Sequence, residues 1–347
     1  MSAESTRIVQ RVMSAVLLAL VPVVAMSLSP WSAATGLLVL GVLPTLTAAP
    51  LGVRAMLTAA IGSVVTAFVA VLLAQTGGWA PWLGTALVVL LSLATGALVL
   101  SGLHPVGAAA ISFAAYVLVD PASVIVFLDA RATGLAAAAA VTTLVLLGCG
   151  WVIGAVATVL RGVTLPPTDR LPPTLPYGAL LAVLCGGFTL VCAYWFHGTN
   201  AWWAVMTVAV ILQPTHGETG TKLRGRIVGT ILGGTLAALI AVILPGELVG
   251  ILLGVAASLA SVMLLLSGAA YWKYSVAVTM SVILLTFERS EVVVGDIQRI
   301  LVTVAAAAVT AAVVSIATRL APAQALADPG QRSGGERPPG RSGKLRP

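Results

Sequence analysis

Three basic residues at the start of a glycine-rich apolar run are the first group in this sequence that could do chemistry. Lys222, Arg224 and Arg226 occupy alternate positions just before and at the start of that run. Clustered cations at the mouth of an apolar bundle raise the local concentration of anions, so we expect them to attract an anionic molecule. An equally good interpretation makes them an anchor that fixes the orientation of a membrane helix.

Glycines recur at every fourth position of the run that follows, at Gly225, Gly229 and Gly233. This spacing leaves a smooth groove in which a second helix backbone can approach closely. We therefore expect a helix at the centre of a bundle. Its partner is a helix of the same chain or of a second copy, which leaves a homo-oligomer open.

Uncharged polar side chains are the other candidates for a binding route. No Asp, Glu, Lys or Arg falls near the middle of an apolar run, and such residues usually mark proton relays in membranes. We therefore expect a route lined by hydroxyl, amide and aromatic groups, with Thr207 and Gln213 among them. This lining suits an amphiphilic molecule with one charged group better than a metal ion. The other hydroxyls on the expected route are Thr230, Thr279, Ser281 and Thr286.

A charged loop near the C-terminal end offers a different kind of site. Glu288 and Arg299 each stand at the end of an apolar run, with Arg289, Glu291 and Asp296 between them. We hypothesise that Glu288 and Arg299 form a proton-sensitive pair at an outer mouth. The alternative is a solvated, self-neutralising loop. Normal transport across pH by both Glu288→Gln and Arg299→Ala would contradict the pair.

The composition sets the environment of all these residues. The chain has 347 residues, of which 59% are hydrophobic and 8% charged, with a mean hydropathy of +1.07. A soluble domain carries about 25% charged residues, so soluble domains, a disordered chain and a nucleic-acid-binding domain are excluded. The sequence predicts an all-α polytopic membrane protein. Most tryptophans near the ends of apolar runs, Trp202 included, are expected to anchor helices at the membrane interface.

The apolar runs number about twelve, and we expect them in two six-helix units. Residues 1–11 form an N-terminal segment, 12–160 the first unit, 161–176 a polar Pro-rich hinge, 177–320 the second unit and 321–347 a disordered basic tail. Pro105–Leu118 and Ala201–Gln213 are short enough to be half-helices. The runs are Val12–Leu28, Ala33–Ala49, Ala55–Ala74, Trp82–Leu100, Pro105–Leu118, Gly134–Leu160, Tyr177–Trp195, Ala201–Gln213, Ile227–Leu244, Val249–Leu266, Tyr271–Leu285 and Ile300–Thr318.

Similar landmarks in the two units predict an internal repeat. They recur in the same order at offsets of 166 to 172 residues: Trp31 with Trp203, Gly62 with Gly233, Gly102 with Gly268 and Arg131 with Arg299. Internal repeats are common in secondary transporters, where the substrate lies between the repeats.

The basic residues predict the topology of these runs. With both termini in the cytoplasm of a multi-pass cell-membrane protein, only Arg131, Arg289 and Arg299 of the 18 Lys and Arg residues face outward. This asymmetry is what the positive-inside rule requires.

The segment from Asn200 to Pro245 resembles the fusaric acid resistance family, which is also grouped with the aromatic acid exporters. The likeness rests on Trp203, Leu212-Gln213-Pro214, Arg224 or Arg226, Gly229-Thr230 to Gly233-Gly234, and the run from Tyr271 to Glu288. It covers the second unit and reaches the first only through the repeat. It implies export of aromatic or other amphiphilic organic acids, with Trp203 and Tyr274 in contact with the substrate. Unlike many members, this chain has no sizeable soluble domain between its units.

Two other functions stay open. One is a passive anion channel resembling aluminium-activated malate transporters, which would follow the membrane potential and ignore a pH gradient. The other is a major-facilitator-type transporter, because Gly220–Arg226 resembles a cytoplasmic loop of that family. No nucleophile, catalytic dyad, cofactor motif or metal-ligand spacing stands out, so we expect neither an enzyme nor a cofactor nor a metal site. The expected partners are membrane lipid and a small organic anion, with no nucleic acid.

Overall fold

The computed structural model describes residues 3–126, 128, 134–159, 175–244, 246–286 and 292–320, and every regular element in these ranges is a helix. The chain forms two compact units, Met1–Ala307 and Ala308–Pro347. Of the second unit only the end of the last helix is described, so the fold and the site below belong to the first. The expected tail and the hinge up to residue 174 lie outside the described residues.

Eight candidate membrane spans are found among the described residues, which supports the prediction of a multi-pass helical membrane protein. They fall on the helices α1 (Ala3–Ser27), α3 (Val53–Ala74), α4 (Ala80–Leu98), α7 (Leu135–Val159), α8 (Leu175–Trp195), α10 (His216–Ile243), α11 (Glu247–Leu266) and α13 (Val292–Leu320).

Four apolar helices are shorter, α2 (Thr35–Thr47), α5 (His104–Val119), α9 (Trp203–Ile211) and α12 (Tyr271–Thr286). A helix needs about 20 residues to cross a hydrocarbon core of about 30 Å, and α5 and α12 have 16 each. The helix α9 ends early because Leu212 is extended, with φ −68° and ψ 122°. The expected total of about twelve spans in a duplicated unit therefore stays a prediction. A fifth short helix, α6 (Pro121–Ile125), follows α5.

The helix α5 lies at the centre of the compact unit Met1–Ala307. It packs against α2, α3, α4, α8 and α9, and twelve of its sixteen residues are buried. A helix that is apolar on every side is stable only when other elements surround it. The position of α5 therefore brings its two ends, His104 and Tyr116 with Asp120, next to segments far away in sequence.

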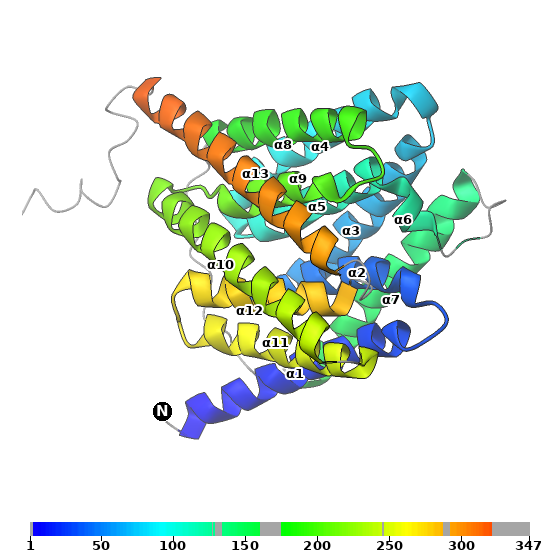
Figure 1. Ribbon diagram of the computed structural model, residues 1–347, viewed down its shortest axis with the longest axis vertical. Helices are drawn as coiled ribbons and strands as arrows, with labels where there is room; N and C mark the ends of the chain where they lie inside the picture. The colour runs from blue at the N-terminus through cyan, green and yellow to red at the C-terminus, as the bar shows by residue number, and fades with distance from the viewer. Residues whose placement is uncertain are drawn as a thin grey trace, which may run out of the picture. The chain divides into compact units, whose positions relative to one another are not determined.

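The other main contacts pair helices from distant parts of the chain. The helix α8 packs on α4, and α11 contacts α1, while α12 packs on both α10 and α11. Figure 1 shows α10, α12 and α11 side by side, with α8 next to α4. The helix α7 packs against α1, α2 and α3.

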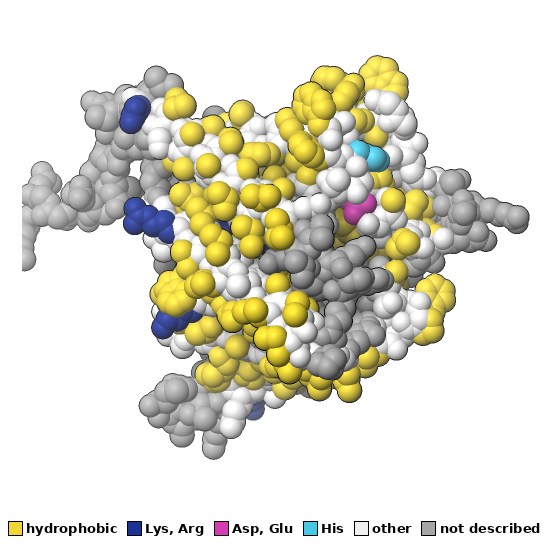
Figure 2. All heavy atoms as spheres, viewed as in Figure 1, with side chains coloured by type: hydrophobic (Ala, Val, Ile, Leu, Met, Phe, Trp, Pro, Cys, Tyr) yellow, Lys and Arg dark blue, Asp and Glu magenta, His cyan; other side chains and the backbone are white. Residues whose placement is uncertain are grey.

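Large apolar side chains remain exposed on the outer faces of the long helices. On α10 they include Leu232, Leu236 and Leu239, and on α11 Leu248 and Leu252. Apolar side chains cover much of the face of the molecule seen in Figure 2. An apolar surface of this extent is not found on soluble monomers, and it suits contact with lipid chains.

Candidate functional site

The break between α9 and α10 is held by the side chain of Gln213. Its Nε2 atom donates to the carbonyl oxygens of Val210 and Leu212, both at 2.9 Å. Its backbone N–H donates to Thr219 Oγ1 at 3.1 Å. These bonds satisfy carbonyls that the end of α9 leaves without intrahelical partners. The break is thus an ordered, polar structure between two apolar helices.

Lys222 joins this break from the second turn of α10. Its Nζ atom donates to Gln213 Oε1 at 2.7 Å, so the structure brings together two residues that the sequence analysis singled out separately. Glu218 lies in the first turn of α10, where a negative charge interacts favourably with the helix N-terminus. The neighbouring Arg224 is exposed to solvent.

His104, at the start of α5, is within the electrostatic influence of Lys222 and Glu218, and no local pattern in the sequence predicts this. Burial lowers the pKa of His104 from its usual 6.5, the charge of Lys222 lowers it further, and the charge of Glu218 raises it. Its Nδ1 atom is buried and has no hydrogen-bond partner among the described residues. The influence of Lys222 thus reaches a residue of the first unit of the predicted repeat.

Arg226 lies one turn further along α10 than Lys222 and is buried, with 5% of its surface exposed. Its charge acts on the phenols of Tyr271 and Tyr274 on α12, whose ring centroids are 5.8 Å apart. In the described part of the chain, its Nε atom has no hydrogen-bond partner. A buried guanidinium is costly unless an anion or several acceptors surround it, so this is the strongest candidate for an anion site.

The helix α12 lies in the glycine groove of α10. A Cβ atom on Gly225 would lie 2.5 Å from the ring of Tyr271. One on Gly229 would lie 2.2 Å from Ser275 Oγ, and one on Gly233 2.5 Å from the carbonyl oxygen of Val276. The partner of the glycine groove in this structure is therefore a helix of the same chain, and α12 presents small polar side chains to it.

Three buried hydroxyls follow Arg226 along this helix pair. Thr230 on α10 and Ser275 and Thr279 on α12 are almost fully buried, and none has a hydrogen-bond partner within the described ranges. Other buried hydroxyls of the chain, such as those of Thr45, Ser92 and Thr189, donate to the carbonyl four residues earlier. An unpaired buried donor costs about 1–3 kcal/mol. The α10–α12 pair therefore carries unused hydrogen-bond donors.

A second arginine, Arg299 on α13, is buried against the first residue of α9. Arg299 has 1% of its surface exposed, and its guanidinium carbon lies 3.8 Å from the ring centroid of Trp203, itself 4% exposed. A solvated loop is therefore the wrong interpretation for Arg299. The loop residues from 287 to 291, Glu288 included, lie outside the described residues, so the proposed Glu288–Arg299 pair stays a prediction. Thr207, one turn along α9 from Trp203, is also buried.

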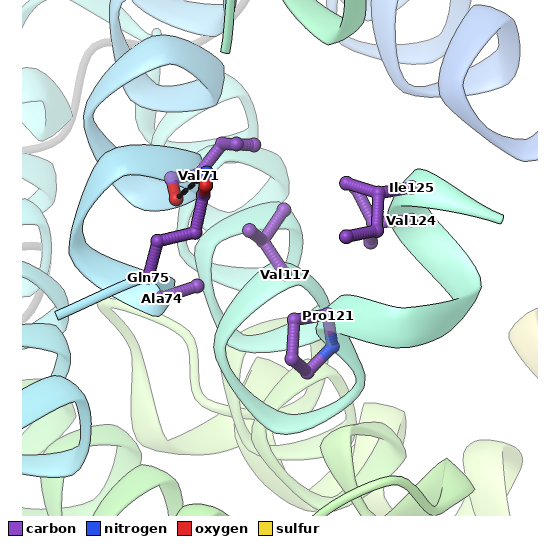
Figure 3. A pocket seen from close by; sticks show the side chains of 7 residues that line it. All are labelled: Val71, Ala74, Gln75, Val117, Pro121, Val124 and Ile125. Carbon is purple, nitrogen blue, oxygen red and sulfur yellow. Dashed lines mark hydrogen bonds between the residues drawn. The ribbon is translucent and has the colours of Figure 1, made fainter. Parts of the chain in front are cut away.

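The cavities do not coincide with either arginine. Figure 3 shows a hollow of about 10 Å³ in which Pro121, Val124 and Ile125 face the ends of α3 and α5. Its polar side chain, Gln75, uses its Nε2 atom to donate to Val71 O at 2.9 Å. A cleft of about 130 Å³ between α3, α4 and α5 is mostly apolar. The described residues contain no group of His, Cys, Asp and Glu that could hold a metal ion.

These observations define the class of the protein. The described chain is all-helical, has eight candidate spans and exposes apolar side chains on its outer faces, so it is a multi-pass membrane protein. Residues 184–314 match the family described as fusaric acid resistance protein-like. The match includes Trp203, Arg226 and Arg299, and it leaves out α5. No curated protein and no solved structure matches the chain.

Proposed function

We propose that the protein is a transporter that exports small aromatic or amphiphilic organic anions across the cell membrane. The observation that carries this proposal is the buried guanidinium of Arg226, whose charge acts on the phenols of Tyr271 and Tyr274. The family match to residues 184–314 supports a membrane transporter and favours it over the major-facilitator alternative. The proposal involves no catalysed reaction, cofactor or metal.

The chemistry of the α10–α12 pair accounts for the choice of an anion. A carboxylate beside Arg226 offsets the cost of burying its guanidinium. The unused hydroxyls of Thr230, Ser275 and Thr279 supply further donors for carboxylate oxygens. The exposed Arg224 and the partly buried Lys222 attract anions toward this region. The phenol rings suit the apolar body of the substrate.

The membrane orientation and the repeat belong to the same proposal. Both termini face the cytoplasm, in keeping with the distribution of basic residues. The four shorter apolar helices support the repeat, because they are the second and fifth apolar helices of each expected unit. Their first residues are Ser32 and Asn200 for one pair, an offset of 168, and His104 and Tyr271 for the other, an offset of 167.

Cross-packing of the helices agrees with this arrangement. The first helix of the expected second unit, α8, packs on the fourth helix of the first, α4. The first helix of the chain, α1, contacts α11, which is the fourth helix of the second unit. A pseudo-twofold relation between the units produces both contacts, and transporters with parallel repeats bind substrate near such an axis.

Uptake of radiolabelled benzoate and 4-hydroxybenzoate into inside-out vesicles tests this function, with and without an imposed pH gradient. Arg226→Gln is compared with Arg224→Gln, which removes an exposed charge of the same type. We expect uptake to fall about tenfold or more in Arg226→Gln, since a hydrogen bond to a charged group contributes about 1.5–3 kcal/mol. Arg224→Gln should lose less than about half.

The vesicle experiment also separates the alternatives. Accumulation driven by the gradient supports an exporter, and equilibration that follows the membrane potential alone supports the channel. Equal uptake by both variants would remove Arg226 from the site. Absence of uptake of every acid in the panel by the wild-type chain would overturn the substrate class.

A further inference from the structure

The cleft of about 130 Å³ opens between α3 and α4 and has α5 as its floor. Its floor residues Val106, Gly107 and Ala110 are buried, whereas Gly62 on α3 and Ala94 on α4 are exposed. The helices α3 and α4 both pack more extensively against α5 than against each other. The cleft is therefore closed by α5 on one side and open to the outer face of the bundle on the other.

Small side chains keep the two walls of this cleft apart. A Cβ atom on Gly62 would meet no neighbouring atom of the described chain within 4 Å. The packing at the floor is close, because a Cβ atom on Gly107 would lie 2.2 Å from Thr95 Oγ1. The cleft thus belongs to the gap between α3 and α4, and it does not reflect loose packing of α5.

The lining of the cleft favours an apolar occupant. Apart from three threonines, its residues are aliphatic or glycine. Thr58 Oγ1 donates to the carbonyl oxygen of Arg54 at 3.0 Å. Thr95 Oγ1 donates to that of Leu91 at 2.7 Å. These two hydroxyls therefore need no acceptor from a ligand.

The outer faces of the same two helices indicate which apolar molecule lies at the opening. They carry large exposed aliphatic side chains, namely Leu57, Ile61, Val65, Leu90 and Leu93. In a membrane-spanning helix such faces contact the acyl chains of lipids. The cleft is continuous with these faces, so an acyl chain is the molecule that can enter it directly from the bilayer.

A basic residue lies at one end of the cleft. Arg54 is in the first turn of α3 and is exposed, one turn before Thr58 and on the same side of the helix. The lining residues of α3 extend from Thr58 to Thr66, a helical length of about 12 Å. Half of a hydrocarbon core of about 30 Å is about 15 Å. The cleft therefore extends over most of one leaflet, with Arg54 at the level of the head groups.

We propose that this cleft is a binding site for an anionic phospholipid, with one acyl chain between α3 and α4 and the phosphate at Arg54. A guanidinium matches the oxygens of a phosphate with two parallel hydrogen bonds. The cleft accepts the chain of any phospholipid, and Arg54 adds the preference for a net negative head group. The bound chain supplies the contact between α3 and α4 that the two helices do not make themselves. The site does not involve the transported anion.

Native mass spectrometry of the purified full chain tests this site, with phosphatidylglycerol and phosphatidylcholine of the same chain length as probes. The readout is the dissociation constant of the tightest lipid site. Gly62→Leu places a side chain in the cleft and should weaken binding of both lipids about fivefold or more, because the leucine takes the contacts of the acyl chain. Arg54→Gln should weaken phosphatidylglycerol about fivefold and phosphatidylcholine less than about twofold.

Each variant has a matched control outside the cleft. Gly150 on α7 is also exposed, and in the described chain a Cβ atom there would have no neighbour within 4 Å. Arg319, in the last turn of α13, is also exposed. Gly150→Leu and Arg319→Gln should leave both dissociation constants unchanged.

Ala94→Leu narrows the cleft from the side of α4 and keeps the test decisive if Gly62→Leu does not fold. Unchanged lipid binding in both of these variants overturns the proposal, and so does an equal loss in Gly150→Leu. An equal loss of both lipids in Arg54→Gln overturns the assignment of the head group. A dimer that Gly62→Leu abolishes without any change in lipid binding would assign the cleft to a second copy of the chain instead.

Discussion

Two regions of the molecule bury an arginine against aromatic rings, and they do so in different ways. The charge of Arg226 acts on the phenols of Tyr271 and Tyr274, on a helix that packs in the glycine groove of α10. At Arg299 the neighbour is the indole of Trp203, which stacks on Trp202, and the ring of Tyr116 on α5 is tilted against Trp202. A phenol hydroxyl donates and accepts, while an indole N–H donates alone.

The two regions depend on different parts of the chain. The Arg226 region lies on α10 and α12, inside the segment that matches the family. The ring contact at Trp202 requires Tyr116 of α5, and α5 lies outside that segment. The close approach of α10 and α12 distinguishes the first region further, since a single added methyl group has no space there.

The glycine groove should show the largest effect on stability. Gly233→Ala places a methyl group 2.5 Å from the backbone oxygen of Val276, and overpacking of this kind costs about 1–3 kcal/mol. Gly220→Ala is the control, because a Cβ at Gly220 has no atom within 4 Å; it should leave stability unchanged or raise it by up to about 1 kcal/mol. Unfolding in SDS micelles measures both. Equal stability of the two variants would show that α12 does not lie in the groove.

The coupling of each arginine to its ring should be smaller and should differ between the regions. In a double-mutant cycle, Arg299→Met with Trp203→Leu should give about 1–2 kcal/mol, because the desolvated cation lies directly over the ring. The matching cycle of Arg226→Met with Tyr274→Leu should give less than about 1 kcal/mol. The measurement is the same SDS unfolding. A larger coupling at Arg226 than at Arg299 would reverse the comparison.

The smallest effect expected is a pH dependence confined to the Arg226 side of the comparison. The folded state lowers the pKa of His104 from 6.5, so the unfolded chain binds more protons near that pH. The contribution of His104 to stability is complete above pH 6.5 and is lost as the pH falls through the pKa of the folded state. His104→Asn should therefore flatten the loss of thermal stability just below pH 6.5, while Tyr116→Leu should keep the wild-type slope. Identical slopes in wild type and His104→Asn would contradict this assignment.

Composition and local pattern were sufficient to predict the class of the protein and the family whose model matches residues 184–314. The scarcity of charge predicted a helical membrane protein, and the Trp203 to Gly233 segment predicted the family that matches residues 184–314. The glycine spacing predicted a close helix neighbour for α10, although it could not say which helix. These predictions succeed because they rest on spacing within one helix or one short segment.

Contacts between helices far apart in sequence could not be predicted from local patterns. His104 is influenced by Lys222, and Tyr116 contacts Trp202, because α5 is buried among five other helices, and no local pattern encodes that position. Trp202 was expected to anchor a helix at the interface, whereas in the structure its ring lies between a stacked Trp203 and a tilted Tyr116. Arg299 was assigned to a loop because its sequence neighbours are charged, and its burial against Trp203 depends on tertiary packing.

The packing of α8 on α4 has a consequence for the order in which the molecule is made. A Cβ on Gly96 would lie 2.8 Å from the Cα of Gly178, so the two helix backbones touch there. Gly178 leaves the ribosome 82 residues after Gly96 (178 − 96). Until then α4 has only part of its final surroundings, because α8 supplies much of its packing. The packing of α4 is therefore completed only by α8. Membrane insertion of the helices that precede α8 cannot by itself finish the assembly of the bundle.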